Sequence, residues 1–104
     1  MPLVPAFTDG RPPVPAGDRP ALWFWARVEG ADPVQPVCVF VSYETLWGFD
    51  PSQLRDVYSA LAIFEANRAR IEEVASAQFD LRGGDQGDQH QGQPVLTLRA
   101  QDFQ

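Results

Sequence analysis

The strongest constraint on this fold is an apolar stripe at helical spacing in the second half of the chain. Its members fall on one face of a helix: Leu54, Val57, Tyr58, Leu61, Phe64, Ile71, Ala75 and Phe79. Asp50 is a good N-cap, Pro51 suits the first helical position, and Gln53 completes a capping-box-like pair. The pattern predicts a helix over about residues 51–81 whose apolar face packs against the rest of the protein.

Three apolar segments predict the sheet that this helix covers. Residues 21–29 are rich in aromatic and branched side chains, residues 37–41 are apolar on both faces, and residues 95–99 alternate. A short helical turn capped by Ser42 is expected at residues 43–47. The expected fold is α+β, a small antiparallel sheet of three to four strands packed against one long helix.

The predicted helix is long for its domain. About 30 residues of helix span roughly 45 Å, whereas a compact domain of this size has a radius of gyration of about 13 Å. The helix must therefore kink, fray near Ser76, or project and leave apolar residues for a partner chain.

The length of 104 residues predicts a single domain. Residues 1–20 hold six of the ten prolines and predict an extended arm, docked through Phe7 and compatible with a short edge strand at residues 3–7. Residues 83–94 contain no apolar side chain apart from Pro94, and they predict a disordered Gly/Gln loop.

The charge balance argues against several partners. The formal net charge is −6, whereas a protein that binds nucleic acid or an anionic membrane surface needs a positive face. No apolar run is long enough to span a membrane, and the start of the chain does not resemble a secretory signal. A single cysteine, Cys38, cannot form an internal disulfide. We expect a cytoplasmic protein with no nucleic-acid or membrane partner.

An ordered set of short motifs resembles the bacterial family known as domain of unknown function 1488. The motifs are Phe24-x-Ala26-x-Val28-x-Gly30, Ser42-Tyr43-Glu44-Thr45-Leu46, Phe64-x-x-Asn67-Arg68-x-x-Ile71-Glu72-x-x-Ala75, Val95-x-Thr97 and Asp102-Phe103. The resemblance covers about residues 7–103 and implies a short antiparallel sheet with one long helix against it. The proline-rich start and the Gly/Gln loop depart from the pattern. The resemblance implies no activity.

Residues that could carry catalysis or bind a metal are few. His90, the only histidine, lies near Asp85 and Asp88, but the spacing fits no Ca²⁺ loop because Leu96 stands where a Glu is needed. A solvated linker is the favoured interpretation of His90. Cys38 lies in a predicted strand, away from His90, and no Gly-x-Ser-x-Gly motif occurs. We predict no catalytic, metal or cofactor-binding residue, no cofactor, and a chain that leans away from being an enzyme.

Arg68 falls in the middle of the apolar stripe, where a charge needs a partner. One interpretation is an anion-binding arginine in a cleft between helix and sheet. The favoured interpretation is a structural salt bridge to Asp102 or, as second choice, Glu44.

Trp23 and Trp25 share one strand face with Arg27. They could form a platform that stacks a base or a sugar. The favoured interpretation is a face covered by the proline-rich arm or by a second subunit. Trp47 is expected in the core.

Two function hypotheses follow. The first is a non-enzymatic structural or protein-interaction module that acts as a homodimer, because the overlong helix and the two-Trp face would need cover. The second is a small-molecule or anion binder in which Arg68 and Trp25 line a pocket between helix and sheet.

Overall fold

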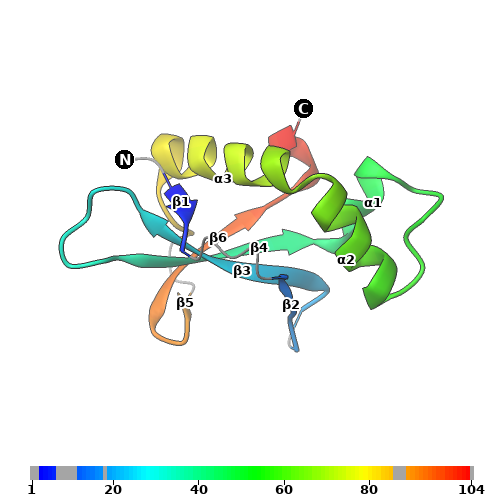
Figure 1. The fold of residues 1–104 in the computed structure, drawn as a ribbon, viewed down its shortest axis with the longest axis horizontal. Helices are drawn as coiled ribbons and strands as arrows, with labels where there is room; N and C mark the ends of the chain where they lie inside the picture. The colour runs from blue at the N-terminus through cyan, green and yellow to red at the C-terminus, as the bar shows by residue number, and fades with distance from the viewer. Residues whose placement is uncertain (1–2, 7–11, 18, 86–88, 104) are drawn as a thin grey trace.

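The computed structural model describes residues 3–6, 12–17, 19–85 and 89–103, and it has an α+β fold. Within these residues, the helices α1 (Tyr43–Phe49), α2 (Val57–Ala66) and α3 (Arg68–Arg82) lie on one side of a mixed sheet. The hairpin formed by β5 (Gln89–His90) and β6 (Gln93–Leu98) extends on the other side (Figure 1). A short 3-10 helix, Ala100–Phe103, follows β6.

The sheet is larger than expected and is not purely antiparallel. Its order is β1-β3-β4-β6-β5, built from β1 (Leu3–Pro5), β3 (Ala21–Val28), β4 (Pro36–Ser42), β6 and β5, while β2 (Val14–Pro15) also pairs with β3. The prediction of three to four antiparallel strands was wrong because β6 pairs parallel to β4. The helices between these two strands carry the chain back along the sheet, so β6 enters in the same direction as β4.

The single long helix predicted over residues 51–81 is in fact two helices. α2 begins only at Val57, because Asp56 and Ser59 form a reciprocal capping box: the Asp56 carboxylate accepts from the Ser59 N–H at 2.9 Å. Asp50, the expected N-cap, instead follows the last residue of α1. Asn67 separates α2 from α3, and its side chain donates to the Ile63 carbonyl at 2.8 Å. Of the three outcomes anticipated from the helix length, the structure shows an interruption, which lies at Asn67, while α3 continues through Ser76 to Arg82.

The core between helices and sheet agrees with much of the predicted stripe. Phe64, Ile71 and Ala75 are buried, together with the inward-facing residues of β3, β4 and β6. Tyr58 and Trp47 were wrongly placed in the core, since they are 78% and 54% exposed. Tyr58 lies in the first turn of α2 and is roughly 200° around the helix from Ala60, so it points away from the face that buries Ala60, Ile63 and Phe64.

The predicted short helix after β4 is confirmed. The Ser42 hydroxyl accepts from the Thr45 N–H at 3.1 Å, and α1 runs from there to Phe49. Thr45 is buried, and its hydroxyl donates to the Leu98 carbonyl at 3.2 Å. This bond links α1 to the last residue of β6.

The proline-rich arm, where an edge strand at residues 3–7 was compatible with the sequence, and the segment predicted as a disordered loop both contribute strands. In the proline-rich arm, Leu3–Pro5 and Val14–Pro15 pair with β3, while Phe7 lies outside the described residues. In the segment predicted as a disordered loop, Gln89–His90 pairs with the start of β6. Gln91 and Gly92 connect these strands with positive φ angles of 52° and 78°, which is the geometry of a tight hairpin turn. Across the described ranges, no helix is both long and apolar enough to cross a membrane.

Candidate functional site

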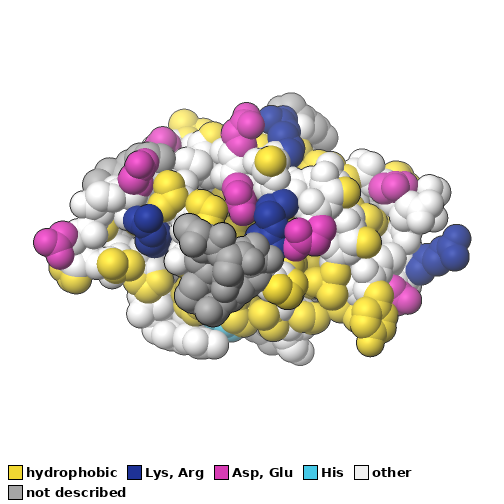
Figure 2. All heavy atoms as spheres, in the orientation of Figure 1, with side chains coloured by type: hydrophobic (Ala, Val, Ile, Leu, Met, Phe, Trp, Pro, Cys, Tyr) yellow, Lys and Arg dark blue, Asp and Glu magenta, His cyan; other side chains and the backbone are white. Residues whose placement is uncertain are grey.

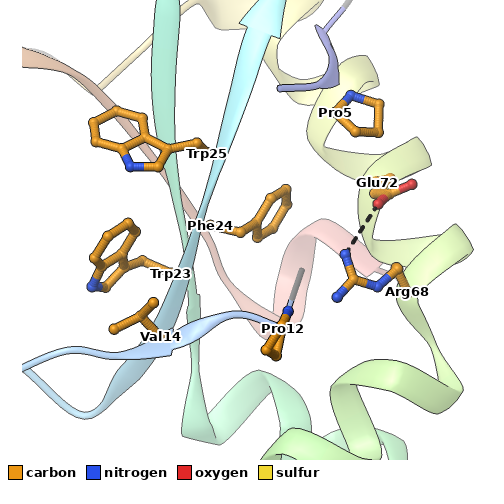
Figure 3. Close-up of a pocket in the computed structure, with 8 residues that line it drawn as sticks. All are labelled: Pro5, Pro12, Val14, Trp23, Phe24, Trp25, Arg68 and Glu72. Atoms are coloured by element: carbon orange, nitrogen blue, oxygen red, sulfur yellow. Dashed lines mark ion pairs between the residues drawn. The ribbon is translucent and has the colours of Figure 1, made fainter. Parts of the chain in front are cut away.

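A pocket of about 150 Å³ lies at the outer edge of β3. β1 pairs with residues 26–28 of β3 and β2 pairs with residues 22–23, so Phe24 and Trp25 stand between two short strands. The pocket opens at this interval, between β3 and α3 (Figure 3). The described residues that line it are Pro5, Pro12, Val14, Trp23, Phe24, Trp25, Arg68 and Glu72.

Because side chains alternate between the two faces of a strand, the aromatic residues of β3 line the pocket from both faces. Trp23 and Trp25 project from one face of β3, while Phe24 projects from the other face toward α3 (Figure 3). The two indole rings meet edge to face, with centroids 5.7 Å apart and planes at 79°. The pocket therefore reaches around the edge of a strand, with aromatic surface on both sides of it.

Arg68 supplies a charged group at the helix side of the pocket. It is the first residue of α3, and its side chain is 22% exposed. Its Nε donates to Glu65 Oε2 at 3.1 Å, its Nη2 donates to Glu65 Oε1, and its Nη1 lies 3.6 Å from Glu72 Oε1. The guanidinium also lies 5.0 Å from the centre of the Phe64 ring.

These contacts shift the protonation equilibria of the ion pair. The hydrogen bond from Arg68 lowers the pKa of the Glu65 carboxyl below its ordinary value of 4.5, against a smaller opposing effect of burial. The same hydrogen bond raises the pKa of Arg68, again opposed by burial. Both groups are therefore charged at neutral pH.

The salt bridges predicted from Arg68 to Asp102 or Glu44 were wrong. Asp102 accepts from the Arg99 N–H at 2.9 Å and lies 3.8 Å from Arg82, while Glu44 is exposed on α1. Glu65 lies three residues before Arg68 and Glu72 lies four residues after it, the spacing of neighbours on a helix surface. Near neighbours on a helix surface meet more easily than groups that the tertiary fold must bring together.

The face that carries Trp23 and Trp25 is covered largely from within the chain. The His90 ring of β5 lies 4.7 Å from the Trp23 ring, 6.1 Å from the Trp25 ring and 5.5 Å from the Phe40 ring. The proline-rich arm contributes as expected, since Ala16 packs against this cluster and the Arg19 guanidinium lies 4.3 Å over Phe40. His90 is half-buried among aromatic rings, so its interpretation as a solvated linker was wrong.

The role of His90 was missed, although the sequence holds a signal for it. Gln91-Gly92 is a two-residue sequence compatible with a tight hairpin, flanked by residues that alternate between the two sides of the strands. The signal is weak because glutamine is uncommon where φ is positive. Among the described residues, no group of three His, Cys, Asp or Glu side chains could hold a metal ion.

The chemistry of the pocket suits reversible binding. Its walls are aromatic and proline rings, and its polar rim is an Arg–Glu pair in which a donor and an acceptor lie side by side. Figure 2 shows the same mixture on the surface: basic side chains lie beside acidic ones, with a band of hydrophobic side chains next to them. The three residues singled out from the sequence, Trp23, Trp25 and Arg68, all line this one pocket.

Comparisons with known proteins agree on one family. The family model described as "Protein of unknown function (DUF1488)" matches residues 6–90. The fold is similar to the crystal structure of a protein of unknown function from the DUF1488 family of Shewanella loihica PV-4, with a TM-score of 0.63, 21% sequence identity, and coverage of 86% of this chain and 88% of that chain. No curated protein matches the chain. Its sequence over most of its length and its fold together make this chain a member of the DUF1488 family.

Proposed function

We propose that this chain is a non-enzymatic binding module that holds a small ligand in the pocket between β3 and α3. One observation carries the proposal: Trp23 and Trp25 from the strand and Arg68 from the helix, more than 40 residues apart in sequence, line the same pocket. A concave site with aromatic walls and few polar groups is the usual form of a small-molecule site. The described lining residues include no serine, cysteine or histidine, so reversible binding is favoured over nucleophilic catalysis.

The homodimer and an unidentified protein partner have less support. The dimer hypothesis depended on an overlong helix, but α3 has 15 residues and α2 is a separate helix. It also depended on a bare two-Trp face, which His90 contacts from within the chain. Light scattering at micromolar concentration separates the two proposals: a mass of 11.6 kDa favours the monomeric binding module, and twice that mass favours the dimer.

We also propose a cytoplasmic location, supported by cysteine usage. Cys38 is the only cysteine in the sequence and is buried, so the fold depends on no internal disulfide. This proposal is secondary to the binding site, and fractionation of the natural host cell tests it.

A thermal-shift screen of single-ring aromatic compounds, followed by calorimetric titration, tests the proposed binding. We expect a subset to raise the melting temperature, and we expect Arg68→Met to weaken their binding by roughly tenfold, as loss of one charged hydrogen bond predicts. The matched control is Arg70→Met, because Arg70 lies on the same helix, pairs with Glu73 at 3.5 Å and is 52% exposed. Equal loss of binding in both variants, or no ligand at millimolar concentration, would contradict the proposal.

A further inference from the structure

The charges around the pocket point to the class of ligand. Resting on the proposed function, we infer that the pocket takes an uncharged, planar, single-ring group that carries both a hydrogen-bond donor and an acceptor, such as an aromatic carboxamide. This inference differs from the anion binding that Arg68 alone suggests. It depends on pocket size, on the shape of the walls and on the charges at the rim.

The volume of the pocket limits the ligand to one ring. The pocket measures about 150 Å³, which is the size of a cavity that accepts a benzene ring. Typical sites for larger ligands measure roughly 300–1,000 Å³. A fused double ring or a nucleotide would have to extend out of the pocket.

The walls favour a flat apolar body. Trp23 and Trp25 offer indole surfaces at 79° to each other, and Phe24 faces α3 on the other side of the strand edge. Pro5 and Pro12 add rigid, apolar rings that lose little conformational entropy when a ligand binds. An aromatic ring can meet these surfaces in stacked or edge-to-face geometry.

The rim disfavours an anion. Arg68 is hydrogen-bonded to Glu65 and paired with Glu72, so these three groups together carry a net charge of −1. An incoming carboxylate would have to compete with Glu65 for the same guanidinium and would approach the Glu72 carboxylate, which lines the pocket. A carboxamide avoids this repulsion, because its N–H₂ can donate to Glu72 while its carbonyl accepts from Arg68.

Benzamide and benzoate form a matched pair of probes, since they have the same size and shape and differ in charge. We expect calorimetric titration of the full chain at neutral pH to show benzamide binding about tenfold more tightly than benzoate, the ratio that one unfavourable charge contact near the surface predicts. Benzoate binding as tightly as benzamide would overturn the inference and leave the proposed function intact. Binding of neither compound at millimolar concentration would count against the proposed function and the inference together.

Two variants test whether the rim charge sets this preference. Glu72→Gln removes the carboxylate that lines the pocket, and we expect the preference for benzamide over benzoate to fall severalfold. Glu73→Gln is the control, because Glu73 is 74% exposed, pairs with Arg70 and does not line the pocket. An unchanged ratio in Glu72→Gln, or an equal change in Glu73→Gln, would overturn the inference.

Discussion

The two long edges of the sheet are closed in different ways. Beyond the short pairing with β5, the outer edge of β6 is capped by side chains and a loop: Thr97 N–H donates to Asp85 Oδ2 at 2.9 Å, and Arg82 donates to the Thr97 carbonyl at 2.9 Å. The Asp85 N–H also donates to the Val95 carbonyl at 2.6 Å. The outer edge of β3 is paired by two separate short strands, and the pocket lies between them.

This difference shows that a sheet edge can be protected from pairing with another chain either by filling it completely or in a way that leaves room for a ligand-binding pocket. Unpaired backbone groups on an edge strand invite pairing with another chain. The Arg82–Asp85 ion pair, with 2.6 Å between Nη1 and Oδ1, occupies the position of a further strand and fills the β6 edge. At the β3 edge, strands of three and two residues leave room for side chains of β3 and α3 to meet a ligand.

The largest expected effect comes from opening the closed edge. Asp85→Ala removes the acceptor of Thr97 N–H and the partner of Arg82, and we expect a loss of about 2–3 kcal/mol in the free energy of unfolding. Urea denaturation measures the loss, and light scattering reports any association through the exposed edge. Asp85→Asn keeps one acceptor oxygen and should lose less. If both variants were as stable as the parent chain, the side-chain cap would not be what protects this edge.

His90→Ala should loosen the aromatic face behind the pocket edge. The His90 ring contacts Trp23, Trp25 and Phe40, and we expect a loss of about 1–2 kcal/mol. Near-ultraviolet circular dichroism should weaken and tryptophan fluorescence should shift to longer wavelength, because water reaches the indole rings. Gln89→Ala, at an exposed neighbouring position, is the control. Unchanged tryptophan spectra in His90→Ala would show that the hairpin does not order these rings.

Gly84→Ala tests how closely the loop after α3 approaches β6. A methyl group at Gly84 would lie 3.1 Å from the Val95 carbonyl oxygen, inside ordinary contact distance. We expect a net loss of about 0.5 kcal/mol, since the strain is partly offset by the lower entropy of the unfolded chain. The control is Gly17→Ala, where no atom of the described residues other than its chain neighbours lies within 4 Å of the added methyl group. A stabilised Gly84→Ala variant would mean that the loop can move away from the strand at no cost.

The smallest expected effect is the pH dependence of the unfolding free energy that the Glu65–Arg68 ion pair at the pocket contributes. The pKa of Glu65 is lowered in the folded chain, so its stabilising contribution is fully present above its ordinary value of 4.5 and is lost as the pH falls through the lowered pKa. Because Glu65 is half exposed, solvent screening limits this contribution to about 0.5 kcal/mol or less. Arg68→Met should remove this acid-dependent part of the unfolding free energy. An unchanged pH profile in that variant would show that the ion pair adds no stability.

Much of the fold could be predicted from the sequence because local patterns agreed with the final packing. The apolar stripe placed Phe64 and Ile71 in the core, where they are fully buried. The parallel pairing of β6 could not be predicted, because it depends on where three helices return the chain. The helix start was misplaced because the sequence offers two N-caps, Asp50 and Asp56. The reciprocal hydrogen bonds between Asp56 and Ser59 stabilise the helix start at Val57, and among the described residues the Asp50-Pro51 pattern forms no such pair of bonds.

The sequence indicated some of the residues that belong to the candidate site, but it did not indicate how they are arranged. A charge within an apolar stripe and two tryptophans on one strand drew attention to Arg68, Trp23 and Trp25, which line one pocket. The partners of Arg68 were mispredicted because the prediction considered carboxylates of the sheet and the tail and did not consider its near neighbours on the helix, Glu65 and Glu72. Glu72 was not recognised as part of the site, although it belongs to one of the family motifs and lies four residues after Arg68, the spacing of neighbours on a helix surface.

The most direct test of the pocket at the β3 edge is a nuclear magnetic resonance titration of the isotope-labelled chain with benzamide. We predict that the largest shift changes occur at the indole N–H groups of Trp23 and Trp25 and at the Arg68 side chain, while Thr97 at the closed edge is unaffected. Shift changes spread evenly over both edges, or centred on Thr97, would contradict a ligand site between β3 and α3.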